Sequence, residues 1–68
     1  MDFRLSSQRH AIKALDLLRA AGYEDASHGV RGTSVREHII SVPAVQSGIA
    51  FEVTRMVRAV DPDAEPLS

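Results

Sequence analysis

The sequence contains no cysteine and no tryptophan, and it has one tyrosine and two phenylalanines among its 68 residues. Without cysteine, the chain has neither disulfide bonds nor thiolate metal sites. No apolar run approaches the ~18–20 residues of a membrane-spanning helix. The N-terminus also lacks the basic and apolar regions of a signal peptide. These absences favour a cytoplasmic protein without a membrane segment.

The formal net charge of −1 does not favour a dedicated nucleic-acid binder, because such domains are usually strongly basic. A chain of this length buries only roughly 60% of the surface that its unfolded form exposes. Domains this small are often stabilised by a disulfide, a metal or a partner. No cofactor or metal motif is present, so we expect stabilisation by a homo-oligomer, such as a homodimer, or by a protein partner.

Two segments have the apolar spacing of amphipathic helices. Residues 7–21 carry apolar side chains on one face, and Gly22 follows where a left-handed residue commonly closes a helix. Pro43 fits the first turn of a second helix, which Asp61 and Pro62 end. The expected buried face of this second helix consists of Val45, Ile49, Val53, Met56 and Val60.

Strand signals flank these helices. Residues 1–5 alternate between apolar and polar side chains, and residues 35–42 are rich in β-branched residues. Residues 23–34 are compatible with a frayed strand and a turn, or with a loop. Residues 63–68 are expected to form a tail, or an edge strand that needs a partner to become ordered.

This order predicts an α+β fold in which two amphipathic helices pack on a small antiparallel sheet. Residues 1–62 would form a single domain, followed by the segment 63–68. The order is similar to the ferredoxin-like split βαββα arrangement, with the last strand missing or weak. The resemblance concerns the order of elements, and it implies no particular function.

The segment 27–34 is a weak candidate for phosphate binding. Small residues, hydroxyl groups and an arginine can hold a phosphate through backbone N–H groups. The candidate residues are Ser27, Gly29, Arg31, Gly32 and Thr33. The sequence 29–32 (Gly-Val-Arg-Gly) also resembles the GXXG loop of KH domains, which implies nucleic-acid binding and requires residues 33–41 to be helical. The alternative is a flexible hairpin loop.

The first residues also resemble the opening of a ribbon–helix–helix repressor. Residues 3–6 (Phe-Arg-Leu-Ser) precede the first helix, as the DNA-reading strand does in that family. This resemblance again requires a helix at 33–41. Nucleic-acid binding through Arg31, Arg36, Arg55 and Arg58 therefore remains the alternative function.

No arrangement of residues indicates catalysis or metal binding. The three histidines are far apart, and a hairpin turning at Arg31–Gly32 would place His28 and His38 on opposite sides of the sheet. Nucleophile motifs such as Gly-x-Ser-x-Gly are absent. The acidic residues are scattered, and most are expected on solvated faces: Asp16, Glu24, Asp25, Glu37, Glu52, Asp61, Asp63 and Glu65.

Phe51 departs most from the expected pattern. On a helical wheel it lies opposite Ile49 and Val53, beside Arg55 and Arg58. Aromatic and arginine side chains are enriched at interface hot spots. We therefore expect a small non-enzymatic interaction or regulatory domain that associates with itself or with a protein partner. Its candidate contact residues are Phe51, Arg55, Arg58 and Phe3, with edge-strand pairing by residues 1–5 or 63–68.

Overall fold

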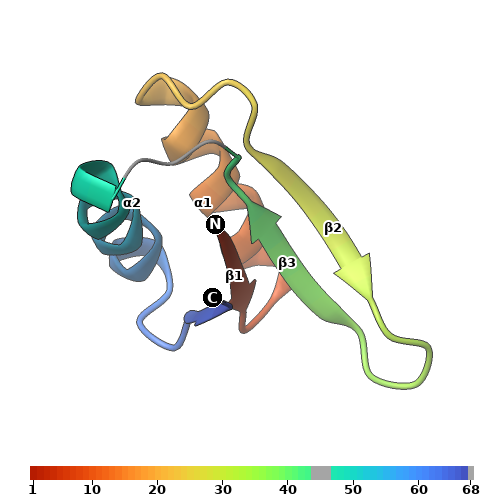
Figure 1. Ribbon diagram of the computed structural model, residues 1–68. Helices are drawn as coiled ribbons and strands as arrows, with labels where there is room; N and C mark the ends of the chain where they lie inside the picture. Colours follow the sequence, from red (N-terminus) through yellow and green to blue (C-terminus); the bar gives the residue numbers. More distant parts are fainter. Residues whose placement is uncertain (44–46, 68) are drawn as a thin grey trace.

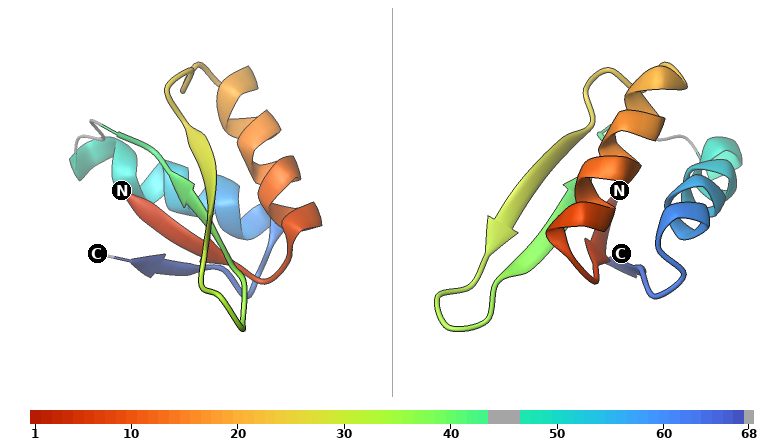
Figure 2. Two further views of the ribbon diagram at one scale, coloured as in Figure 1. Left: turned by 90° about the vertical axis from the view of Figure 1, so that its right-hand side faces the viewer. Right: turned by 180° about the vertical axis from the view of Figure 1, so that it is seen from behind.

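A computed structural model describes residues 1–43 and 47–67. Two helices and four strands follow one another in the order β-α-β-β-α-β. The elements are β1 (Asp2–Leu5), α1 (Gln8–Ala20), β2 (Ser27–Arg31), β3 (Glu37–Ser41), α2 (Ser47–Val60) and β4 (Glu65–Leu67). The four strands form one antiparallel sheet in the order β2-β3-β1-β4, beside which the helices pack (Figures 1 and 2). The expected α+β class is therefore confirmed.

The sheet differs from expectation at its edges. The expected order ended with the second helix and gave residues 63–68 as a tail or an edge strand, and residues 65–67 form the outer strand β4 beside β1. Because β1 lies between β3 and β4, residues 1–5 cannot serve as the free edge strand that the sequence suggested. The two outer strands are β2 and β4. Pro66 is tolerated in β4 because an edge strand does not need every backbone N–H for pairing.

Helix α1 follows the sequence expectation closely. The Ser7 hydroxyl accepts a hydrogen bond from the His10 backbone N–H at 3.2 Å and caps the N-terminus. Gly22 has a φ of 104°, a left-handed conformation that costs glycine little. The helix buries Ala11, Ala14 and Leu18, which lie three and four residues apart on one face.

Helix α2 buries Val53 and Val57 completely, with Met56 and Val60 packed against them. These residues belong to the face that the sequence predicted. Ile49, from the same predicted face, is more exposed at the first turn of the helix. Val45 lies outside the described residues.

The core joins both helices to one face of the sheet. Phe3 and Ile40, which are direct partners across β1 and β3, are fully buried with Leu18, Val53 and Val57. Phe3 and Ile40 point to one side of the sheet, and buried residues of both helices pack against them. Helices α1 and α2 therefore cover the same side of the sheet. The expectation that Phe3 contacts a partner needs correction, since its ring is buried inside this chain.

The β2–β3 hairpin has a different register from the expected one. His28 pairs with Ile40 and Val30 pairs with His38, so the connecting loop is residues 32–36 rather than a tight turn at 31–32. Both resemblances to nucleic-acid-binding families required a helix at 33–41, and residues 37–41 form strand β3 instead. Neither requirement is met, and the strand that the β-branched residues of 35–42 predicted is confirmed.

Candidate functional site

Two histidines meet on the helix-facing side of the β2–β3 hairpin. His28 Nε2 lies 3.1 Å from His38 Nδ1, and the ring centroids are 5.3 Å apart. Their strand positions are diagonal neighbours on adjacent strands, within reach of aromatic side chains. Both residues are partly exposed. The predicted separation of His28 and His38 onto opposite faces is therefore wrong.

The hairpin that carries this pair extends beyond the helices (Figures 1 and 2). Every residue from 29 to 36 is exposed, including Val30 at 52% and Val35 at 74%. As β2 is an outer strand, the backbone groups on its far side do not pair within the sheet. The hairpin thus offers histidines, exposed apolar side chains and a strand edge in one region.

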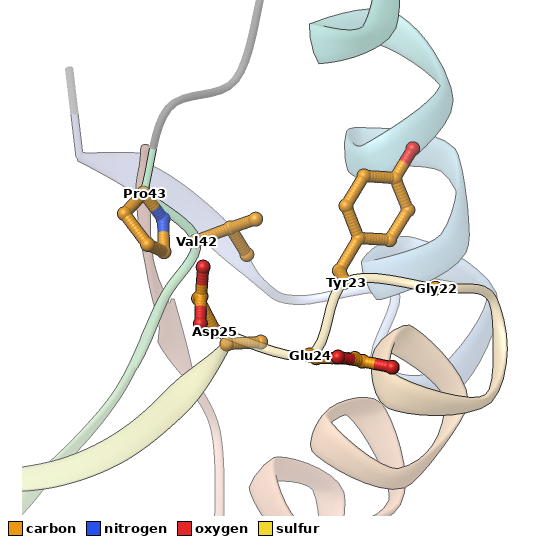
Figure 3. A pocket seen from close by; sticks show the side chains of 7 residues that line it. Gly22, Tyr23, Glu24, Asp25, Val42 and Pro43 are labelled. Atoms are coloured by element: carbon orange, nitrogen blue, oxygen red, sulfur yellow. The ribbon is translucent and has the colours of Figure 1, made fainter.

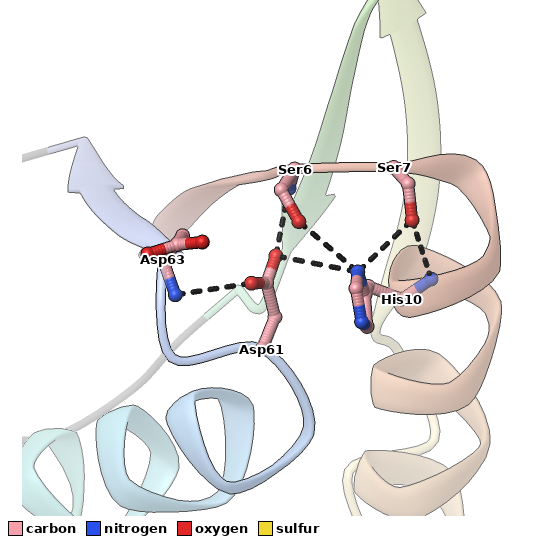
Figure 4. A network of polar contacts seen from close by, with 5 residues as sticks. All are labelled: Ser6, Ser7, His10, Asp61 and Asp63. Atoms are coloured by element: carbon pink, nitrogen blue, oxygen red, sulfur yellow. Dashed lines mark hydrogen bonds and ion pairs between the residues drawn. The ribbon is translucent and has the colours of Figure 1, made fainter.

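A second polar cluster joins the start of α1 to the end of α2 (Figure 4). Asp61 is 1% exposed, and its carboxylate accepts hydrogen bonds from the Ser6 N–H at 2.7 Å and the Asp63 N–H at 3.0 Å. His10 Nδ1 lies 3.0 Å from the Ser6 hydroxyl, 2.9 Å from the Ser7 hydroxyl and 4.0 Å from Asp61 Oδ2. The sequence had placed Asp61 among the solvated acidic residues, and its burial corrects that expectation.

This cluster contains the residue types of a catalytic triad without its geometry. In a triad, the carboxylate holds one ring nitrogen of histidine while the nucleophile contacts the other. Here Asp61 and both hydroxyl groups approach the same Nδ1 atom of His10. The arrangement therefore differs from the relay of a triad, and its hydrogen bonds connect the start of α1 to the segment after α2.

Hydrogen bonding determines the charge state of Asp61. Burial by itself raises the pKa of this carboxyl, but the hydrogen bonds from Ser6 and Asp63, together with nearby His10, outweigh burial and lower the pKa below its usual value. The ionised carboxylate is thus the form that the fold stabilises. The sequence contains no local signal for this role, because Ser6 lies 55 positions away.

The predicted phosphate residues do not form a single loop. Ser27, Gly29 and Arg31 alternate along β2 on the face away from the helices, and only Gly32 and Thr33 belong to the loop. A hollow of about 240 Å³ follows β2 and is lined by Asp2, Ile39, Ser41 and all five residues of that strand. The Asp2 carboxylate opposes binding of a phosphate there, so the geometry does not favour this site.

The four candidate arginines also lie in separate places. Arg31 ends β2 and Arg36 belongs to the hairpin loop, while Arg55 and Arg58 lie on α2, on the other side of the molecule (Figure 1). Among residues 1–43 and 47–67, the open face of the sheet carries no aromatic side chain for stacking bases, since Phe3 faces the helices. Arg4 on that face is paired with Glu37 at 3.2 Å and with Glu65.

The outer surface of the helices contains the remaining candidates. Phe51 is 72% exposed on α2, and Leu17 on α1 is 39% exposed. An open groove of about 300 Å³ runs between the helices and is lined by Leu17, Glu52, Arg55, Met56 and Ala59. Arg55 lies one helical turn after Phe51, so the two side chains share a face of α2. Arg58 is exposed near the end of α2.

A smaller cavity lies between the α1–β2 connection and the end of β3 (Figure 3). It has a volume of about 140 Å³ and is lined by Gly22, Tyr23, Glu24, Asp25, Ala26, Val42 and Pro43. Ligand pockets usually occupy roughly 300–1,000 Å³. This cavity is therefore too small to enclose an ordinary metabolite.

The described part of the chain contains no larger cluster of metal-coordinating side chains. Among residues 1–43 and 47–67, no group of three or more histidine, cysteine, aspartate or glutamate side chains is placed to hold a metal ion. Within the same residues, neither helix has the length and apolar character needed to cross a membrane.

Comparison with protein-family models, with curated proteins and with solved structures returns no significant match. The function of the chain is therefore inferred from its own residues.

Proposed function

We propose that the protein is a small non-enzymatic interaction domain that binds a second copy of itself or a protein partner. The observation that carries this proposal is the exposure of Phe51, which presents 72% of its surface to solvent beside the groove between α1 and α2. Exposed aromatic and arginine side chains around an apolar centre are typical of interface hot spots.

The groove supplies the apolar centre. Leu17 and Met56 line it from opposite helices, and the charged side chains of Glu52 and Arg55 lie beside them. A partner that covers Phe51 and this groove would bury apolar surface while the charged groups remain at the rim. This distribution is the common pattern of protein interfaces.

We also propose that the architecture is ferredoxin-like. The order β-α-β-β-α-β and the sheet order β2-β3-β1-β4, with both helices on one face, support this assignment. Such a fold accommodates many functions, so it supports neither the proposed role nor its alternative.

The nucleic-acid alternative has less support. The KH and ribbon–helix–helix resemblances both require a helix at residues 33–41, where the structure has strand β3. The candidate arginines also lie on distant elements. Its distinguishing measurement is the dependence of binding on salt, because phosphate contacts weaken steeply as the salt concentration rises.

Sedimentation velocity over a wide concentration range tests self-association. We expect a reversible dimer of the wild-type chain, and we expect Phe51→Ala to weaken it at least tenfold. Val35→Ala is the matched control, because Val35 is as exposed as Phe51 but lies at the hairpin tip. A dimer that Phe51→Ala leaves unchanged contradicts the helix surface as the interface, and a monomer at every concentration contradicts self-association.

A further inference from the structure

The His28–His38 pair has the geometry of a two-histidine metal chelate. The facing nitrogens, His28 Nε2 and His38 Nδ1, are 3.1 Å apart. Two imidazole nitrogens bound tetrahedrally to one Zn²⁺ at about 2.0–2.1 Å are separated by roughly 3.3 Å. A right-angled arrangement around Cu²⁺ or Ni²⁺ brings such nitrogens to about 2.9 Å. The observed separation falls between these two values.

The backbone already holds the two rings near each other. His38 pairs with Val30 and His28 pairs with Ile40, so the histidines occupy one face of two hydrogen-bonded strands. Their rings are tilted by 37° rather than stacked flat. To bind one ion, the two imidazole rings must rotate, but the pairing of β2 with β3 does not change. Because the strands already hold the rings together, the side chains lose little conformational freedom on binding.

The surroundings leave the pair accessible. Both histidines are partly exposed, and Val30 between them in sequence is 52% exposed. Arg31 ends β2 on the opposite face of the strand, and Arg19 donates a hydrogen bond of 3.2 Å to the Ala26 carbonyl oxygen just before β2. That carbonyl partly offsets its charge.

From this geometry we infer that His28 and His38 together bind a divalent first-row transition ion such as Zn²⁺. The two facing nitrogens provide two ligands, and water molecules complete the coordination shell. In the metal-free pair, one facing nitrogen donates its proton to the other. In the bound form, each neutral ring carries its proton on the outer nitrogen, so both inner lone pairs are available to the ion.

Isothermal titration of untagged protein with Zn²⁺ tests the site, together with NMR detection of the histidine ring nitrogens. We expect Zn²⁺ to shift His28 Nε2 and His38 Nδ1 selectively, and to raise the melting temperature of the protein. His28→Gln and His38→Gln should each weaken Zn²⁺ binding at least tenfold, because each variant removes one of two ligands.

The third histidine provides the matched control. His10 lies at the start of α1, outside the hairpin, so His10→Gln should leave Zn²⁺ affinity unchanged. Two separate hairpin variants are used, so that poor folding of one does not remove the test. Equal Zn²⁺ affinity in all three variants, ring shifts confined to His10, or no binding at excess Zn²⁺ would each overturn the proposal. Any of these results leaves the proposed interface at Phe51 unaffected.

Discussion

The molecule has two polar clusters, and they differ in what they connect. Around Asp61, hydrogen bonds join chain segments that are 55 positions apart, and the carboxylate is almost fully buried. Around His28 and His38, the partners are ten positions apart on one hairpin and remain partly exposed. The comparison indicates that the Asp61 cluster stabilises the fold, while the hairpin is available for binding.

Replacing Asp61 should have the largest effect. Asp61→Ala leaves the Ser6 and Asp63 backbone N–H groups without their acceptor, and we expect the free energy of unfolding to fall by about 2–3 kcal/mol. Urea unfolding followed by circular dichroism measures this change. Asp63→Ala is the control, because the Asp63 side chain is exposed. Equal losses in both variants would show that the buried carboxylate has no special role.

A glycine substitution tests the hairpin by itself. Gly32 has a φ of 91°, and a Cβ atom placed there would collide with the Val35 carbonyl oxygen. Gly22 also has a positive φ, but a Cβ atom meets nothing within 4 Å there. We expect Gly22→Ala to lower the free energy of unfolding by about 1 kcal/mol, and Gly32→Ala to lower it further. A smaller loss at Gly32 would show that the hairpin tip rearranges at little cost.

Acid should act on the Asp61 cluster with a smaller effect than Asp61→Ala. The pKa of Asp61 is lower in the folded chain than its usual value of 3.8, so its contribution to stability is fully present above that pH. The contribution is lost as the pH falls from 3.8 through the lowered pKa. Urea unfolding at a series of acidic pH values should therefore show a steeper decline for the wild type than for Asp61→Asn. Parallel curves would contradict this assignment.

The smallest effect is expected at the tip of the hairpin. Val35 is 74% exposed and makes no contribution to the buried core. Val35→Ser should change the free energy of unfolding by less than about 0.5 kcal/mol, as is usual for surface substitutions. Val53→Ala is the contrasting variant, because Val53 is fully buried on α2, and it should cost roughly 2 kcal/mol. Similar losses in the two variants would mean that the hairpin tip is packed in solution.

The two helices could be predicted from the sequence because their signals are local. The apolar spacing of α1 and the glycine that follows it both lie within one continuous segment. The buried positions Val53 and Val57 likewise follow from spacing along α2 alone. Phe51 was recognised as exposed for the same reason, since a helical wheel places it away from these valines.

The hairpin register could not be predicted in the same way. A turn at Arg31–Gly32 pairs His28 with Val35, whereas the observed loop pairs His28 with Ile40. The expected and observed pairings differ by an odd number of residues. Because successive strand residues point to opposite sides of the sheet, this shift changes which side chains share a face. One misplaced turn was therefore enough to separate two histidines that are in contact.

The role of Asp61 escaped prediction, and the sequence alone could not decide between a tail and an edge strand for residues 63–68, for a different reason. Each depends on a partner near the other end of the chain: Asp61 on Ser6, and β4 on β1. Neither partner is visible in a local window of sequence. Pro66 also made residues 63–68 resemble a tail, although an outer strand accepts proline.

The pairing of β4 with β1 has a consequence for the path of the chain. Asp2 and Leu67 are direct partners across these strands, so the first and last strands bring the two ends together (Figure 1). A short linker between these ends would close the backbone into a circle. New termini could then open between Ser34 and Val35, in a stretch where both residues are exposed. Such a circular permutant would be synthesised in a different order and would still assemble the same four-stranded sheet.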